Sequence, residues 1–288
     1  MLQPFRVLIP EEIIGASTEL ARLGEKAVVY AGGAELALLL RYGMIRADYL
    51  VNIKRIRGMN EITWDGETIQ IGAAMTHHRV ETDPLIRRHM PLFAYAEGKI
   101  ANIRVRNQGT LGGNLCFNDP HSDPGTALLL YDTSVSLANK TNWRQLPLCE
   151  FLTGMYSTAL MAGEILASVA IKPLPLDWGT AYLRVHRLQR PTLNVAVATK
   201  LKDGILEKVR MAVGCVGPKP QRLLEIEDKI VGLKIEDANK IIMESTRYFV
   251  NLLEPVDDVL GSTDYKMYMT RILLSRALSQ ASAAKEEV

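Results

Sequence analysis

A pair of adjacent glycines inside a polar run constrains this chain more than any other feature of its sequence. The pair, at positions 112–113, lies within the segment 102–123. Glycines lack side chains, so the backbone N–H groups of such a segment can approach an anion closely. A second pair, at 32–33, lies between the apolar run 27–31 and a helical pattern over 35–40, so its N–H groups are expected near a helix N-terminus. Two such loops can hold the diphosphate of one dinucleotide.

Length and charge exclude several classes of protein. A chain of 288 residues with 48% hydrophobic residues is long enough for two packed domains. The 34 basic and 32 acidic residues are dispersed and give a net charge of +2, so no nucleic-acid partner and no anionic membrane partner is expected. No apolar run reaches the roughly 18 residues of a membrane span, and the first residues lack the features of a secretion signal. We therefore expect a cytoplasmic protein.

The residue types that ligate metals show no spacing typical of a metal site. The three cysteines, Cys116, Cys149 and Cys215, lie far apart without a Cys-x-x-Cys motif, so neither an iron–sulfur cluster nor structural zinc is expected within the chain. Adjacent histidines point apart on a strand, and His77 and His78 are interpreted as surface or loop residues rather than as ligands. No Ser-His-Asp or Cys-His arrangement is evident, so no catalytic residue is predicted.

The order of the expected elements indicates an α+β protein. Apolar residues at helical spacing over 11–23 precede a strand, and the dipeptide 65–66, Asp-Gly, joins two alternating segments as a β-hairpin. A Pro-Leu-Pro segment at 173–175 follows a strand expected at 165–171 and is interpreted as a domain boundary. Beyond it the sequence predicts a small antiparallel sheet with helices on one face, the strands at 180–185, 193–201 and 209–216 and the helices at 223–233, 235–253 and 265–284.

The glycine pairs do not belong to a Rossmann site, because the fingerprint of three spaced glycines directly after a strand is absent from the sequence. Taken singly, each pair is more typical of an ordinary turn than of a binding loop. Together, however, residues 30–36 and 103–114 resemble the two flavin-binding motifs of the FAD-carrying medium subunits of molybdenum hydroxylases. This family includes the flavoproteins of carbon monoxide dehydrogenase and xanthine dehydrogenase. The resemblance continues through 71–76, 123–130 and 163–166 and covers essentially the whole chain.

The resemblance implies the fold and its division into domains. Residues 1–175 would form an FAD-binding domain of the vanillyl-alcohol oxidase (PCMH) type, made of two α+β subdomains. Residues 176–288 would form a C-terminal domain like that of the carbon monoxide dehydrogenase flavoprotein, a small antiparallel sheet with helices. Relatives with covalent flavin attach it through a His or Cys near the first glycine motif. This chain has neither there, so FAD is expected to bind without a covalent link.

The same resemblance assigns the residues that would contact FAD. The two motif segments would surround the diphosphate and the ribityl chain. Ala34 stands where many relatives carry Ser, Thr or His, and Glu35 stands where many carry Asp or Ser. In the loop 119–123, cofactor contact by Asp123 and loop capping by Asp119 are preferred to a divalent-ion site. The implied cofactor-binding residues are Tyr30, Ala31, Gly32, Gly33, Ala34, Glu35, Leu36, Ile100, Thr110, Leu111, Gly112, Gly113, Asn114, Asp123, Leu166 and Arg184, the last where relatives often place Lys.

The resemblance further implies an electron-transfer role within a larger complex. Substrate oxidation would take place at a molybdopterin centre on a large partner subunit, and electrons would pass through [2Fe-2S] clusters on a small partner subunit to FAD on this chain. By analogy with the family, the complex would be a dimer of heterotrimers. Two alternatives remain open: a stand-alone FAD oxidoreductase of the same fold, and a scaffold subunit without flavin. The sequence names neither the substrate nor the electron acceptor.

Overall fold

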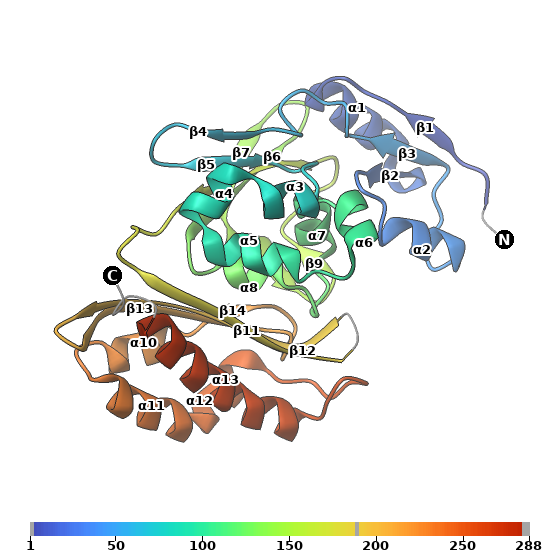
Figure 1. Ribbon diagram of the computed structural model, residues 1–288. Coiled ribbons are helices and arrows are strands. Elements are labelled where there is room, and N and C mark those ends of the chain that lie inside the picture. Colours follow the sequence, from blue (N-terminus) through green and yellow to red (C-terminus); the bar gives the residue numbers. More distant parts are fainter. Residues whose placement is uncertain (1–2, 188–189, 284–288) are drawn as a thin grey trace.

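The computed structural model describes residues 3–187 and 190–283. The chain forms three parts that follow one another along the sequence and also in space (Figure 1). A small first subdomain with a three-stranded sheet is followed by a larger second subdomain with a five-stranded sheet. A C-terminal part then adds a four-stranded sheet and a layer of helices. The α+β class predicted from the sequence is confirmed.

The first subdomain is a parallel sheet with two helices. Its elements are β1 (Arg6–Leu8), α1 (Ile13–Leu23), the 3-10 turn η1 (Gly24–Lys26), β2 (Ala27–Tyr30), α2 (Leu36–Arg41) and β3 (Tyr49–Asn52). The strand order is β1-β3-β2, and both strand pairs are parallel. The crossover from β2 through α2 to β3 leaves the first glycine pair at the carboxyl end of a parallel strand, which is where open α/β sheets bind ligands.

The second subdomain is built on an antiparallel sheet. Its elements are β4 (Ile62–Trp64), β5 (Ile69–Gly72), α3 (His77–Thr82), α4 (Pro84–His89), α5 (Pro91–Gly98), α6 (Ile103–Gln108), α7 (Leu111–Phe117), α8 (Pro124–Leu128), β6 (Asp132–Ala138), β7 (Trp143–Pro147), α9 (Leu148–Phe151), β8 (Leu152–Gly154), β9 (Ser157–Thr158) and β10 (Ile165–Lys172). The strand order is β4-β5-β10-β6-β7. The predicted hairpin from β4 to β5 is confirmed, and the Asp65 carboxylate accepts hydrogen bonds from the N–H groups of Glu67 and Thr68 in its turn.

Prolines divide the helical segment that follows β5 into short helices. Pro84 begins α4, where Asp83 Oδ1 accepts hydrogen bonds from the N–H groups of Leu85 and Ile86, and Pro91 begins α5. A proline is tolerated at the first helical position because the N–H that it lacks would have no partner within the helix. These breaks let the chain fold back on itself, so that α3 and α5 lie in contact. The contact later brings together two polar side chains that are distant in sequence.

The C-terminal part is an antiparallel sheet with helices on one face. Its elements are β11 (Gly179–Arg187), β12 (Arg190–Lys202), β13 (Ile205–Gly214), β14 (Gln221–Arg222), α10 (Leu224–Ile230), α11 (Ile235–Glu244), α12 (Thr246–Leu253) and α13 (Thr263–Ala283). The single helix predicted over 235–253 is wrong, because the chain leaves helical geometry at Ser245, which has a ψ of 25° and whose N–H donates to the Ile242 carbonyl, three residues back, at 3.3 Å. The helix predicted over 265–284 corresponds to α13, and residue 284 lies outside the described residues.

Strand β12 is buried on both faces, which explains its long apolar run. Val195 and Val197 pack with the helices of the C-terminal part, whereas Ala196 and Ala198 pack with the core of the second subdomain. This division follows from the two-residue period of a strand. Because the alanine side chains are short, the sheet lies directly against α8. The domain boundary after residue 175 stays a prediction.

We predict that Ala198→Leu destabilises the protein, because the larger side chain must fit between β12 and the second subdomain. Overpacking a core costs about 1–3 kcal/mol, and each kcal/mol lowers the Tm by roughly 2–4 °C in domains larger than about 150 residues. Thermal unfolding followed by circular dichroism measures the change. Ala37→Leu, the same substitution at an exposed position of α2, is the control and should leave the Tm nearly unchanged. An equal Tm in both variants would contradict the packing described for β12.

Candidate cofactor-binding site

All three parts of the chain line one cavity of about 600 Å³. This volume lies within the range of small-molecule sites, roughly 300–1,000 Å³. Both glycine segments face it, although they come from different subdomains and are separated by most of the second subdomain's helices in the sequence. Of the residues assigned from the sequence, those that line the cavity are Ala31, Gly32, Gly33, Ala34, Glu35, Leu36, Ile100, Thr110, Gly112, Gly113, Asn114, Asp123 and Leu166.

Three of the assigned residues lie outside the cavity lining. The Leu111 side chain is fully buried in the core that includes the second subdomain's sheet. The Tyr30 ring packs beside Gly33, with the Lys54 ammonium 4.6 Å from its centroid. Arg184 reaches Asp123 from β11 and donates a hydrogen bond to it. These three residues therefore affect the cavity only indirectly, by contact with residues that line it.

The first glycine pair fixes how the first subdomain meets the second. Gly32 is buried against the backbone of residues 108–109, and a Cβ at Gly32 would overlap the Gln108 carbonyl oxygen. Only glycine permits so close an approach of two backbone segments. Gly33 follows with a φ of 76°, in the left-handed region, and turns the chain toward α2. The pair thus brings the two glycine segments into direct contact.

The second glycine pair lies in the first turn of α7 rather than in the loop that the sequence suggested. Thr110 caps this helix, and its Oγ1 accepts a hydrogen bond from the Gly113 N–H at 3.1 Å. Gly112 is buried against Ala73, to whose carbonyl it donates a hydrogen bond at 2.9 Å. Gly113, in contrast, is exposed at the cavity, and Thr110 Oγ1 is the heavy atom within 4 Å of a Cβ built there. Gly113 therefore presents its backbone to the cavity, with the Thr110 hydroxyl beside it.

Asp123 joins the C-terminal part to the cavity wall. Its Oδ1 accepts hydrogen bonds from the Tyr182 hydroxyl at 2.5 Å and from Asn194 Nδ2 at 3.3 Å, and its Oδ2 accepts one from Arg184 Nη1 at 2.7 Å. Burial raises the pKa of Asp123, and the Arg184 guanidinium opposes this rise. Sequence reasoning found Asp123 and Arg184 but not Tyr182 or Asn194. Because residues two positions apart in a strand share a face, Tyr182 lies on the same face as Arg184, and the sequence therefore held a signal for Tyr182.

A backbone turn beside the cavity is held by two arginines. Ala101 has a φ of 40°, which is uncommon for a residue with a side chain. Immediately before Ala101, Arg106 Nη1 donates a hydrogen bond to the Ile100 carbonyl at 3.0 Å, and Arg184 Nη1 donates one to the Lys99 carbonyl at 2.9 Å. These bonds fix the backbone of Ile100, whose side chain lines the cavity.

Arg190, at the start of β12, connects the cavity loops of all three parts. Its Nη1 lies 3.0 Å from Asp119 Oδ2, and its Nη2 lies 3.7 Å from Glu35 Oε1. Asp119 also accepts a hydrogen bond from the His121 N–H at 2.9 Å, the capping contact expected of it. Because half-exposed ion pairs contribute about 0–1 kcal/mol, Arg190 orients these loops more than it stabilises the fold. The sequence held no local signal for Arg190.

The interpretation of His77 as a surface or loop residue is wrong. His77 is the first residue of α3, is 3% exposed and lines the cavity. Its Nδ1 lies 2.7 Å from Oε2 of Glu97, on α5. Because the two residues are 20 positions apart in the sequence, no local pattern reveals the pair. Within residues 3–187 and 190–283, no three His, Cys, Asp or Glu side chains gather as a metal site.

Comparison with known families covers nearly the whole chain. Residues 3–175 match the family described as the FAD binding domain in molybdopterin dehydrogenase, and residues 183–281 match the CO dehydrogenase flavoprotein C-terminal domain. The carbon monoxide dehydrogenase medium chain of Hydrogenophaga pseudoflava is 26% identical, over 98% of this chain and 99% of its own length. The glyceraldehyde dehydrogenase medium chain of Sulfolobus acidocaldarius is 26% identical, over 88% of this chain and 89% of its own length.

Solved structures show the same architecture. One is the carbon monoxide dehydrogenase from Hydrogenophaga pseudoflava that lacks the Mo-pyranopterin moiety of the molybdenum cofactor. A chain of that structure is 26% identical to this one and superposes with a TM-score of 0.93, covering 98% of this chain and 99% of that chain. Quinoline 2-oxidoreductase from Pseudomonas putida 86 shares the fold, with a TM-score of 0.91 at 24% identity over 99% of both chains. The chain therefore belongs to the family of FAD-binding medium subunits of the molybdenum hydroxylases.

Proposed function

We propose that this chain holds FAD in the cavity and passes electrons from partner iron–sulfur clusters to an external acceptor, as the electron-transfer subunit of a heteromeric molybdenum hydroxylase. One observation carries the proposal: glycine segments from two subdomains line a single cavity in a chain of this family. FAD would supply the redox chemistry, and the chain would bind and orient it. The proposal assigns no catalytic acid or base to this chain.

The chemical types of the residues that line the cavity suit the parts of FAD. A diphosphate needs backbone that it can approach without intervening side chains, and the residues before α2 line the cavity with such backbone. The N–H of Gly113 is already bonded to Thr110 Oγ1, so Gly113 would contribute close approach rather than a free donor. Ile100 and Leu166 are apolar lining residues suited to a flavin ring. The Asp123 carboxylate suits a ribityl or ribose hydroxyl. In this proposal Tyr30, Leu111 and Arg184 support the site indirectly, and the FAD-binding domain ends at residue 175.

The proposed partners are a large subunit with molybdopterin and a small subunit with [2Fe-2S] clusters. Two relatives are named as parts of larger enzymes, the 6-hydroxypseudooxynicotine dehydrogenase complex subunit alpha and the nicotine 6-hydroxylase medium subunit of Paenarthrobacter nicotinovorans. We propose that the complex is a dimer of heterotrimers located in the cytoplasm. Among the helices that the structure describes, none is long and apolar enough to cross a bilayer.

The first functional prediction is that FAD is bound without a covalent link. Cys116 lines the cavity, but burial raises the pKa of its thiol to about 12, so the thiol stays protonated and is a poor nucleophile. Acid precipitation of the purified protein should leave the flavin in the supernatant, where chromatography should identify it as FAD. Flavin retained in the pellet would contradict non-covalent binding, whereas FMN or the absence of flavin would contradict the proposed cofactor.

The second prediction separates the roles of the adjacent glycines on α7. Gly113→Val should weaken FAD binding at least about tenfold, a loss of about 1.4 kcal/mol, because its side chain enters the cavity. Gly112→Val should instead lower the Tm of the FAD-free protein, because its side chain overlaps Ala73. Fluorescence titration with FAD and calorimetry of the FAD-free variants measure the two effects. Full FAD occupancy in Gly113→Val would remove Gly113 from the proposed site.

The third prediction is that the isolated chain is catalytically incomplete. With FAD bound, it should leave aldehydes and N-heterocycles unoxidised, because the proposed substrate chemistry lies on a partner subunit. Co-expression with a molybdopterin subunit and a two-cluster iron–sulfur subunit should yield a stable complex in which substrate bleaches the flavin. Substrate turnover by the single chain would favour a stand-alone oxidoreductase. A complex that assembles around a colourless chain would favour a scaffold without flavin.

A further inference from the structure

Glu97 differs from the other buried carboxylates of the described residues. Each of the others forms an ion pair with an arginine, Asp123 with Arg184, Glu164 with Arg144 and Glu227 with Arg222. Glu97 is 0% exposed, its Oε2 lies 2.7 Å from His77 Nδ1, and its Oε1 has no hydrogen-bond partner. A buried carboxylate without a fixed cation is costly, so its presence here calls for a reason beyond packing.

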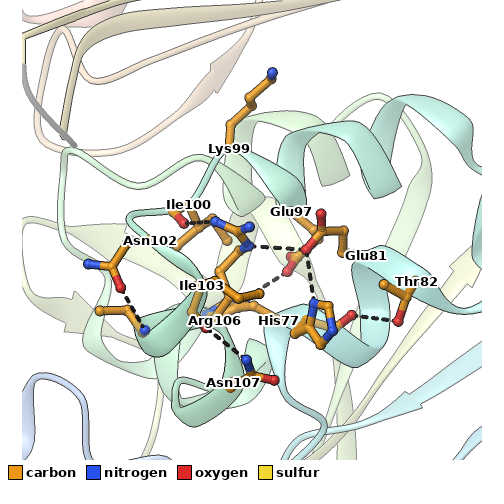
Figure 2. Close-up of polar contacts among 12 residues, drawn as sticks. His77, Glu81, Thr82, Glu97, Lys99, Ile100, Asn102, Ile103, Arg106 and Asn107 are labelled. Carbon is orange, nitrogen blue, oxygen red and sulfur yellow. Dashed lines mark hydrogen bonds and ion pairs between the residues drawn. The ribbon is translucent and has the colours of Figure 1, made fainter.

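His77 lines the cofactor cavity, and its Nδ1 contacts this carboxyl group (Figure 2). The backbone N–H of His77 donates a hydrogen bond to the Gly109 carbonyl at 3.1 Å, and Nδ1 contacts Glu97. The opposite edge of the ring, with Cδ2 and Nε2, lies against Gly109, which is itself part of the cavity lining. The imidazole therefore lies between a buried carboxyl group, which its Nδ1 contacts, and the cavity, which His77 lines.

The charged side chains that surround this pair already have partners of their own. Burial is the main cause that raises the pKa of Glu97. His77 opposes this rise, whereas the Asp123 and Glu81 carboxylates add to it. The surrounding contacts are Arg106 Nε to Glu81 Oε2 at 3.0 Å, His78 Nδ1 to Glu81 Oε2 at 3.3 Å, Arg87 Nε to the Glu81 carbonyl at 2.9 Å, and Arg184 with Tyr182 to Asp123. If Glu97 were ionised beside a neutral His77, the buried negative charge would have no cation to compensate it. The pair therefore keeps one proton in addition to the one that a neutral imidazole carries.

We propose that His77 and Glu97 share this proton, and that Glu97 is a positioning residue that places it on His77 when electrons reach FAD. The Glu97 Oε2–H bond breaks and the His77 Nδ1–H bond forms, so no proton leaves the pair. The resulting imidazolium puts positive charge in the cavity wall and raises the reduction potential of FAD. Once Glu97 is ionised, its carboxylate stabilises the imidazolium, as the ionised carboxylate of a Ser-His-Asp triad does. The inference rests on the proposed function, because it requires FAD in this cavity.

The test compares the reduction potential of FAD bound to the full chain and to its variants. Glu97→Gln keeps the size of the side chain but removes the proton that Glu97 can transfer. At a fixed potential and pH 7, we expect the ratio of reduced to oxidised FAD to fall about tenfold. This fall corresponds to a decrease of about 30 mV in the reduction potential of a two-electron couple. His77→Gln should have the same effect. The double variant should show no further loss, because both substitutions remove one shared proton. Redox titration followed by flavin absorbance measures each ratio.

Glu81→Gln is the matched control, since Glu81 lies on the same group of helices but is partly exposed and already paired with Arg106. Its effect on the ratio should stay below about threefold, because solvent screens it. An unchanged FAD potential in Glu97→Gln and His77→Gln, with only a lower Tm, would assign the pair a purely structural role and overturn the proposal. If Glu97→Gln does not fold, His77→Gln tests the proposal alone, with a tenfold fall in the ratio expected and an unchanged ratio overturning it. A wild-type chain that binds no FAD would instead contradict the proposed function.

Discussion

The contact of Gly32 with the backbone of residues 108–109 is the constraint on which the cavity depends. It joins the first subdomain to the second at the place where both glycine segments face the same space. A side chain at position 32 would separate the subdomains and widen the gap between the segments. Binding that relies on both segments therefore requires no closing motion, because the fold has already fixed their separation. Gly112 acts similarly within the second subdomain through its contact with Ala73, which leaves Gly113 free to face a ligand.

The C-terminal part contributes Arg190 and Pro191 to the cavity lining and also acts on the cavity through the hydrogen bonds that its side chains donate to Asp123. Asp123 receives hydrogen bonds from three side chains of β11 and β12, and an ionised carboxylate can accept about four. One acceptor position thus remains for a hydroxyl from the cavity side. The same arrangement explains why Arg184 stays in place without lining the cavity: its guanidinium compensates the buried charge of Asp123 and also holds the Lys99 carbonyl. Charge compensation and backbone positioning are here performed by one side chain.

Local signals predicted much of this fold, and long-range contacts explain where prediction stopped. The hairpin at Asp65 and the strand over 165–171 follow from turn chemistry and strand alternation, which act over a few residues. Most residues of the two glycine motifs indeed line the cavity. The interpretation of His77 as a surface or loop residue is wrong because its buried partner, Glu97, lies on another helix, 20 positions away in the sequence. Arg190 carried no signal, because its contacts join loops from different parts of the chain. The break at Ser245 is a local backbone change, a ψ of 25° with the Ser245 N–H bonded three residues back to the Ile242 carbonyl, which helical periodicity does not register.

A site built from three parts links ligand binding to the packing between them. A ligand that contacts the loop before α2, the first turn of α7 and the loop at Asp123 binds only the conformation in which all three are assembled, and it stabilises that assembly in proportion to its affinity and concentration. By the same linkage, we expect a change at Ala196 or Ala198 of β12, which do not line the cavity, to alter affinity by displacing Asn194, a donor to Asp123 on the same strand. Side chains such as His77 and Glu97 then adjust the charge that the ligand meets. The fold thus sets the shape of the cavity through backbone contacts and its electrostatics through a few buried pairs.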